Sequence, residues 1–285
     1  MSTKIKENIP NHYQINAKKL LFTKPLIMAI LNLTPDSFYD GGKYSEVNDV
    51  IRDAEEKIRQ GADIIDVGAA SSRPNAKEID ETEEWVRLEP VLRELRKQFP
   101  QTFISVDTYR SSIAKKAAEL GADIINDISG GNLDDKMFEV VSKLDVAYVL
   151  MHMKGTPQTM QQDPNYGDVV YEVKNELEQK VNRLTELNFK NIILDVGFGF
   201  GKTTEHNYQL LKQLPQFSEL GFPILAGVSR KSMINKVIRT NPVTALNGTT
   251  VLNTIALLNG AKILRVHDVT EAMQAIELVE FYRTA

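Results

Sequence analysis

Eight short apolar runs recur along the chain and alternate with longer segments of helical periodicity. The runs are rich in Ile, Val and Leu, as expected of parallel strands that are covered on both faces. They are residues 26–33, 62–69, 103–108, 124–128, 147–153, 191–197, 223–229 and 262–268. This pattern predicts a parallel β-sheet.

The segments between these runs place apolar side chains at helical spacing. Residues 46–60 put Val47, Val50, Ile51 and Ala54 on one helical face. The further predicted helices are residues 83–98, 110–120, 134–144 and 166–187. Because strand and helix alternate eight times, we expect an α/β fold, a closed (β/α)8 TIM barrel.

A repeated junction supports the same fold. Residues 61–66 read Gly-Ala-Asp-Ile-Ile-Asp, residues 121–126 read Gly-Ala-Asp-Ile-Ile-Asn, and residues 260–265 are a looser third copy. Each Gly is expected to end a helix before the next strand begins. Such junctions occur in any α/β protein, so a doubly wound sheet stays an alternative.

The chain shows no Pro/Gly/Ser-rich linker that would divide it. We therefore predict that residues 25–285 form a single barrel domain. Residues 1–24 precede the first barrel strand and are expected to be a short N-terminal segment that caps the barrel bottom.

Composition excludes several classes of function. The 285 residues include no cysteine, which excludes a disulfide scaffold, a thiolate metal site and a cysteine nucleophile. The formal net charge of -4 provides no global attraction for nucleic acid or an anionic membrane, so an anionic ligand needs a local cluster of positive charge. No targeting signal is found, and no apolar run reaches the ~20 residues of a membrane span. We expect a cytoplasmic protein without nucleic-acid or membrane partners.

Polar residues fall near the carboxyl end of every predicted strand, where barrel enzymes carry their chemistry. Polar groups inside apolar runs are costly unless they are satisfied, so their recurrence at one end predicts an active site there. The set comprises Asn32, Asp66, Asp107, Asn126, Asp127, His152, Asp195, Ser229, Arg230, Lys231, Ser232, Arg265, His267 and Asp268.

Single members of this set have simpler interpretations. Asp107-Thr108 could cap the helix that begins near Arg110. Asp66 and Asp127 are interpreted as structural residues that bond to neighbouring loops. His152 is interpreted as a satisfied core histidine rather than a ligand.

Three loops follow strands one, two and six. The first two, residues 32–42 and 70–76, are polar and are expected to close over substrates. The third, residues 195–203, ends in Gly-Lys-Thr, but a phosphate-binding P-loop requires glycine where Val196 stands. The dinucleotide G-x-G-x-x-G pattern also fails. We interpret the alternating Gly and Phe as a backbone that a flat ligand can approach.

In this order, the motifs resemble the dihydropteroate synthase family from about residue 26 to the end of the chain. The motifs that carry the resemblance are residues 31–38, 105–108, 125–128, 150–153, 195–202, 228–232 and 265–268. The resemblance implies a barrel, usually a homodimer, that acts in folate synthesis. Such an enzyme joins 6-hydroxymethyl-7,8-dihydropterin diphosphate to 4-aminobenzoate and releases diphosphate.

The resemblance also implies which residues bind the pterin. Asp195 looks like the carboxylate that accepts the paired pterin donors, and Asn126 suits the mixed edge of ring nitrogens. Lys231 would donate to the pterin carbonyl, and Asp107 looks like a second carboxylate on the pterin side. These four are the expected catalytic residues.

The diphosphate needs local positive charge. Arg265 and His267 are two residues apart on one predicted strand and would share a face. Ser72 and Arg73 would close from the second loop. Asn32 looks like the family's ligand for Mg²⁺, which binds hard oxygens and substrate phosphates.

The aminobenzoate carboxylate would lie at Ser232, near free backbone N–H groups at a helix start. Phe38 and Pro74 would form the apolar walls around the ring. The implied reaction is a displacement at the pterin methylene without a covalent nucleophile.

The sequence departs from the family pattern in two places. Residues 69–75 read Ala-Ala-Ser-Ser-Arg-Pro-Asn where the family usually has Gly-Glu-Ser-Thr-Arg-Pro-Gly, so a glutamate that could restrain Arg73 is absent. Val196 replaces a usual proline. Both changes leave the response to sulfonamide analogues open.

Three other functions remain open at this point. A pterin-binding methyltransferase barrel would share the pterin pocket but needs neither a diphosphate site nor an aminobenzoate site. A non-catalytic pterin-binding relative would be expected to lose the residues of the first loop or the cationic residues. A P-loop kinase is the weakest alternative, because its motif fails.

Overall fold

Eight parallel strands close into a barrel in the computed structural model, which describes residues 9–33, 43–70, 79–156, 158–160 and 164–285. The strand order is β10-β3-β4-β5-β6-β7-β8-β9, and β9 pairs with β10 to complete the ring. The strands are β3 (Leu26–Asn32), β4 (Ile64–Gly68), β5 (Phe103–Asp107), β6 (Ile124–Asp127), β7 (Ala147–Met151), β8 (Ile192–Asp195), β9 (Ile224–Ala226) and β10 (Ile263–Val266). The predicted (β/α)8 TIM barrel is confirmed, and the closed ring excludes the doubly wound alternative.

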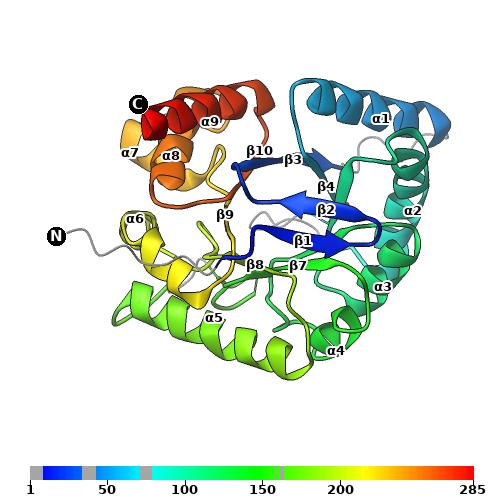
Figure 1. The fold of residues 1–285 in the computed structure, drawn as a ribbon, viewed down its shortest axis with the longest axis horizontal. Helices are drawn as coiled ribbons and strands as arrows, with labels where there is room; N and C mark the ends of the chain where they lie inside the picture. The colour runs from blue at the N-terminus through cyan, green and yellow to red at the C-terminus, as the bar shows by residue number, and fades with distance from the viewer. Residues whose placement is uncertain (1–8, 34–42, 71–78, 157, 161–163) are drawn as a thin grey trace.

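Helices surround the barrel on its outside (Figure 1). They are α1 (Lys43–Arg59), α2 (Glu81–Gln98), α3 (Ser111–Glu119), α4 (Met137–Val141), α5 (Val169–Glu186), α6 (Thr204–Lys212), the 3-10 helix η2 (Leu214–Leu220), α7 (Ser232–Ile238), α8 (Leu246–Leu258) and α9 (Val269–Thr284). The helix predicted over 134–144 is shorter than expected. Asp134 accepts hydrogen bonds from the amides of Ser111 and Lys136 and so lies in a turn before α4.

Strand side chains alternate between two cores. Ile27 and Ala29 of β3 face outward and pack in the large core beneath the helices. Leu26 and Met28 face inward and pack with residues of other strands in a second cluster inside the barrel. On the other strands this apolar interior layer comprises Ile64, Ile124, Ala147, Val149, Ile193, Leu225 and Ile263. The next inward-facing residues along each strand therefore lie above this apolar layer, at the carboxyl end of the barrel.

A hairpin closes the amino end of the barrel. Strands β1 (His12–Ile15) and β2 (Lys18–Leu21) pair antiparallel and lie across the barrel strands (Figure 1). Tyr13, Ile15 and Leu20 pack against the apolar interior layer. Because residues 1–8 lie outside the described part of the chain, the cap over residues 1–24 and the single domain over 25–285 stay predictions.

No helix in the described segments has both the length and the apolar character that crossing a membrane requires.

Candidate active site

A polar layer lies directly above the apolar interior layer. Two residues beyond Ile64, Ile124, Ile193 and Ile263, the same inward faces carry the buried or half-buried side chains of Asp66, Asn126, Asp195 and Arg265. Strand periodicity places all four inside the barrel at its carboxyl end. The structure therefore brings together the strand-end residues that the sequence singled out.

Arg265 of β10 joins three strands. Its Nε donates to Asp66 Oδ2 of β4 over 2.7 Å, and its Nη2 donates to Asp107 Oδ2 of β5 over 2.8 Å. Asp66 also accepts from Ser105 Oγ at 2.6 Å and from Asn126 Nδ2 at 3.1 Å. The guanidinium is thereby held in one orientation by two carboxylates.

Hydrogen bonds in the structure test the simpler interpretations of Asp66, Asp107 and Asp127. The loop interpretation of Asp66 is wrong, because its partners are strand side chains of the candidate site. Of the pair Asp107-Thr108, Thr108 Oγ1 accepts from the Arg110 amide before α3, whereas Asp107 accepts from Arg265. Asp134, not Asp107, accepts from the Ser111 amide that opens α3. Asp127 is structural as predicted, since it accepts from the amides of Ser129 and Gly131.

Burial perturbs the ionisation of Asp107. It raises the pKa of this carboxyl to about 7, against the attraction of Arg265 and with added repulsion from Asp66. Burial alone would lower the pKa of the Arg265 guanidinium, but the negative charges of Asp66 and Asp107 have the larger combined effect and raise it. Asp107 can therefore gain or lose a proton near neutral pH while Arg265 stays charged.

Asp195 and Lys231 form the second part of the layer. Asp195 Oδ1 accepts from the amide of Gly197 over 2.7 Å, and Lys231 Nζ donates to the carbonyl of Phe198. A Cβ on the inward-facing Gly227 would lie 3.8 Å from Lys231 Nζ and 4.0 Å from Asp195 Oδ2, so the missing side chain leaves them room.

The pKa values of Asp195 and Lys231 shift in opposite directions. Burial raises the pKa of Asp195 while Lys231 opposes the rise. Burial lowers the pKa of Lys231 to about 8 while Asp195 opposes the fall. A buried acceptor and a half-buried donor of opposite charge thus lie near each other beside Gly227.

A small apolar cluster borders the polar layer and was missed by the sequence analysis. Met151 lies at the inward position after Val149 on β7 and packs with Ile128, Met153 and Met160. Phe200 packs against this cluster, and its ring lies 4.7 Å from Lys231 Nζ. An apolar wall beside buried polar groups suits a flat ring with a polar edge.

The residues at the barrel mouth have separate roles. His267 Nδ1 lies 2.9 Å from Ser229 Oγ, while Ser232 begins α7 on the surface. Arg230 forms a two-bond ion pair with Asp268, with Nε and Nη2 donating over 2.9 and 2.6 Å. This pair ties the segment after β9 to the segment after β10, so both residues have a structural role here.

Asn32 lies at the exposed end of β3. A Cβ on Gly68 would lie 3.8 Å from the Oδ1 of Asn32 and 3.4 Å from the Cβ of Asp107, so both residues lie next to this glycine.

Four predicted site residues, Phe38, Ser72, Arg73 and Pro74, lie outside the described residues.

The glycine loop after β8 has a different reason for its glycines than the one expected. Gly197, Gly199 and Gly201 all have positive φ. A Cβ on Gly197 would lie 1.9 Å from the carbonyl oxygen of His152, and one on Gly201 would lie 2.5 Å from that of Lys154. The chain's own backbone therefore requires glycine at these two positions, and the approach of a flat ligand to this loop stays a prediction.

Lys202 does not act like a P-loop lysine. Its Nζ is buried and donates to main-chain carbonyls, which excludes the P-loop kinase geometry. His152 is a satisfied core histidine as predicted, with Lys202 at Nδ1 and Glu176 at Nε2.

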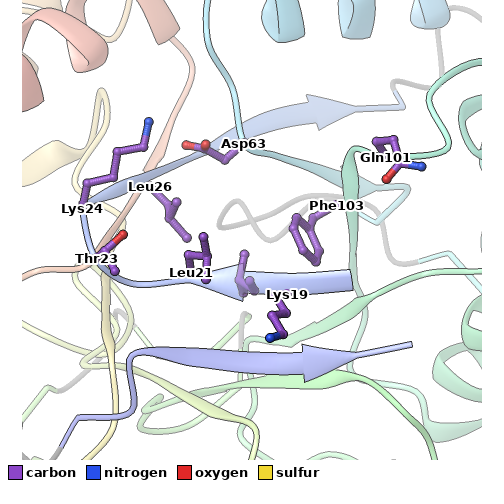
Figure 2. A pocket seen from close by; sticks show the side chains of 9 residues that line it. Lys19, Leu21, Thr23, Lys24, Leu26, Asp63, Gln101 and Phe103 are labelled. Atoms are coloured by element: carbon purple, nitrogen blue, oxygen red, sulfur yellow. The ribbon is translucent and has the colours of Figure 1, made fainter. Parts of the chain in front are cut away.

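A separate hollow of about 300 Å³ lies at the opposite, amino end of the barrel. Figure 2 shows Lys19, Lys24, Asp63 and Phe103 around it, between the hairpin and the strand starts. None of the predicted site residues lines it, and most of its lining side chains are exposed. The polar layer at the carboxyl end is therefore the candidate active site.

Known proteins resemble this chain in sequence and in fold. The sequence profile of a family described as "Pterin binding enzyme" matches residues 28–267. The dihydropteroate synthase of Haemophilus influenzae is 42% identical over 265 residues, which cover 92% of this chain and 96% of that protein.

Two solved structures are also similar. The Yersinia pestis dihydropteroate synthase in a sulfonamide drug complex superposes with a TM-score of 0.90 at 36% identity, covering 96% of this chain and 100% of that one. The Burkholderia cenocepacia enzyme complexed with 7,8-dihydropteroate gives a TM-score of 0.85 at 35% identity, covering 97% and 98%.

Proposed function

This chain belongs to the dihydropteroate synthase family of pterin-binding enzymes, and we propose from that membership and its polar layer that it makes 7,8-dihydropteroate. As a transferase in folate synthesis, it joins 6-hydroxymethyl-7,8-dihydropterin diphosphate to 4-aminobenzoate and releases diphosphate. The observation that carries the proposal is the buried layer of Asp195, Asn126 and Arg265 inside a closed barrel.

The pterin would lie on the polar layer. The Asp195 carboxylate suits the paired donors of the pterin edge, and the Asn126 amide suits its mixed edge. Lys231 already donates to the Phe198 carbonyl and has two further N–H donors for the pterin carbonyl. Asp107 would be a second carboxylate that contacts the pterin, next to Arg265.

The diphosphate would lie above Arg265 and His267, with Ser72 and Arg73 closing from the second loop. Support comes from Arg265, which keeps its charge at the barrel mouth and is aimed by two carboxylates. Fixed positive charge stabilises the negative charge that develops on the leaving diphosphate.

Magnesium is the expected cofactor. The described residues contain no group of three or more His, Asp or Glu that could hold a metal, so they form no protein cage. Asn32 offers an exposed amide oxygen at the mouth, which fits Mg²⁺ because this ion uses few protein ligands and takes substrate phosphates and water. When bound, it would neutralise charge on the diphosphate.

The aminobenzoate would enter from the mouth, with its carboxylate near Ser232 and its ring between Phe38 and Pro74. Its amine attacks the pterin methylene carbon, a C–N bond forms, and the C–O bond to diphosphate breaks. Diphosphate leaves with the bonding electrons, and the amine loses one proton to diphosphate or water. The role of this chain is to orient both substrates and to stabilise the leaving group.

We also propose a homodimer. Three side chains of α9, Leu278, Phe281 and Tyr282, are 72–74% exposed, and α8, which packs against α9, exposes Val251 and Leu258. A contiguous apolar surface of this kind marks a protein contact. A cytoplasmic location without nucleic-acid or membrane partners, a cap over residues 1–24 and one domain over 25–285 complete the proposal.

A diphosphate-release assay tests the function. The protein is incubated with the pterin diphosphate and Mg²⁺, with and without 4-aminobenzoate, and products are identified by mass. We expect release that depends on the amine and yields dihydropteroate. Tight pterin binding without turnover would instead support the methyltransferase or the non-catalytic alternative.

A further inference from the structure

Lys202 is an almost fully buried lysine that the proposed mechanism does not use. It is 3% exposed, and its Nζ donates to the carbonyls of Gly197 (3.0 Å), Phe200 (2.9 Å) and His152 (3.2 Å). Burial lowers the pKa of its ammonium to about 7, although Asp195 attracts the charge. The hydrogen bonds therefore offset only part of the cost of keeping this ammonium out of water, which suggests a role beyond stability.

His152 holds Lys202 from the other side. Burial lowers the pKa of His152 to about 4, and the nearby Lys202 charge adds to the fall, so the imidazole is neutral. Its Nδ1 lies 2.9 Å from Lys202 Nζ and accepts a hydrogen bond from a donor that the three-donor ammonium shares with the His152 carbonyl, which places the ring proton on Nε2. Nε2 faces Glu176 Oε2 of α5 at 3.2 Å. Helix α5 thus fixes the ring that fixes the lysine.

Two of the three carbonyls that Lys202 binds, those of Gly197 and Phe200, belong to the loop that contacts the proposed pterin residues. The amide of Gly197 donates to Asp195 Oδ1, while the carbonyl of Gly197 accepts from Lys202. Between the two carbonyls bound by Lys202 lies Phe198, whose carbonyl accepts from Lys231. The conformation of residues 197–200 therefore sets the positions of both Asp195 and Lys231.

We propose that Lys202 is a positioning residue for pterin binding, because its hydrogen bonds to the Gly197 and Phe200 carbonyls fix the loop that orients Asp195 and Lys231. The proposal rests on the proposed function for the assignment of Asp195 and Lys231 to the pterin. Lys202 itself touches no substrate, since its Nζ is buried beneath the loop.

The Lys202→Met variant tests the proposal because methionine keeps an unbranched chain and removes the donors. We expect the KM for the pterin diphosphate to rise about tenfold, as expected for the loss of one to two effective hydrogen bonds, while the KM for 4-aminobenzoate changes less than about twofold. The Kd of the pterin alcohol in calorimetry should rise by a similar factor. Lys202→Arg restores donors and should recover part of the loss.

Lys18→Met is the matched control. Lys18 is also a largely buried lysine, and it donates to the Thr102 carbonyl and to Asp123 at the amino end of the barrel. This variant should lower the thermal midpoint without changing either KM. If it gave the same KM pattern as Lys202→Met, or if Lys202→Met raised both KM values equally, Lys202 would be only structural.

Failure of the proposed function and failure of Lys202→Met to fold can each be distinguished from failure of the Lys202 proposal. If native protein binds pterin but makes no dihydropteroate, the proposed function fails, and the ratio of pterin Kd values still decides the role of Lys202. If Lys202→Met does not fold, Lys202→Arg decides, because its misplaced donors should still raise the pterin KM selectively. An unchanged pterin KM and Kd in a folded variant would overturn the proposal.

Discussion

Arg265 shows how a single residue acquires its role from its neighbours. Two carboxylates from different strands hold its guanidinium, and one of them, Asp66, also accepts from Asn126. Asp66 has no ligand role in the proposed mechanism, yet it aligns an anion-binding residue and a pterin-binding residue. The charge at the floor of the site therefore depends on whether Asp107 is ionised.

The raised pKa of Asp107 makes substrate binding dependent on pH. Below about pH 7 this carboxyl is neutral and Arg265 is less compensated, whereas above it the anion repels the diphosphate. We expect the KM for the pterin diphosphate to rise a few fold between about pH 6 and about pH 8. The measurement is a pH series of initial rates.

Asp107→Asn is the comparison for this series. The ratio of native to variant KM isolates Asp107, because Lys231 and the diphosphate titrate in both proteins. The ratio should rise with pH across this interval. A ratio that does not change with pH would show that Asp107 does not titrate in this interval and would contradict the prediction.

At the scale of single elements, the glycine loop after β8 is the most constrained segment. Gly197 has φ +70° and no room for a Cβ beside the His152 carbonyl, while Gly221 at the end of η2 has φ +81° and nothing within 4 Å. The two glycines share a backbone conformation and differ in space.

Gly197→Ala should therefore cost more than Gly221→Ala. The control carries only the strain of positive φ, roughly 1–2 kcal/mol, whereas Gly197→Ala must also displace the loop that holds Asp195. We expect lower stability in urea denaturation for both and a loss of pterin affinity only for Gly197→Ala. Equal effects on pterin affinity would contradict the role of this loop.

Element by element, the sequence predicted the strands well because parallel strands buried on both faces are almost continuously apolar. Leu26–Asn32 of β3 is an example, and its polar end identified the carboxyl edge. The sequence could not separate Asp66 from Asp127, because both lie at the end of an apolar run and only barrel closure places Arg265 beside the first. No role was predicted for Lys202, because three of its four acceptors are main-chain carbonyls, which every residue carries.

At the scale of the whole molecule, the two ends of the barrel are differently built. The hairpin and the apolar interior layer close the amino end, and the polar layer with its loops forms the carboxyl end. On the outside, the exposed side chains of α8 and α9 form an apolar surface that the proposed homodimer would cover.

Phe281→Glu tests that surface. A charge on this exposed side chain should shift the protein from dimer to monomer in sedimentation, because a desolvated charge opposes association. The control is Tyr171→Glu, which places the same charge on an exposed ring of α5. A native monomer, or an unchanged dimer in Phe281→Glu, would contradict an interface at α9.

The central claim is that the polar layer at the carboxyl end binds the pterin. Calorimetric titration of 6-hydroxymethyl-7,8-dihydropterin into Asp195→Asn and Asp63→Asn compares two carboxylates at opposite ends of one barrel. We predict at least about a tenfold loss of affinity for Asp195→Asn, because one of the two acceptor oxygens becomes an NH2 donor that faces a buried pterin donor, and no loss for Asp63→Asn. Unchanged affinity in Asp195→Asn, or a comparable loss in Asp63→Asn, would contradict the account.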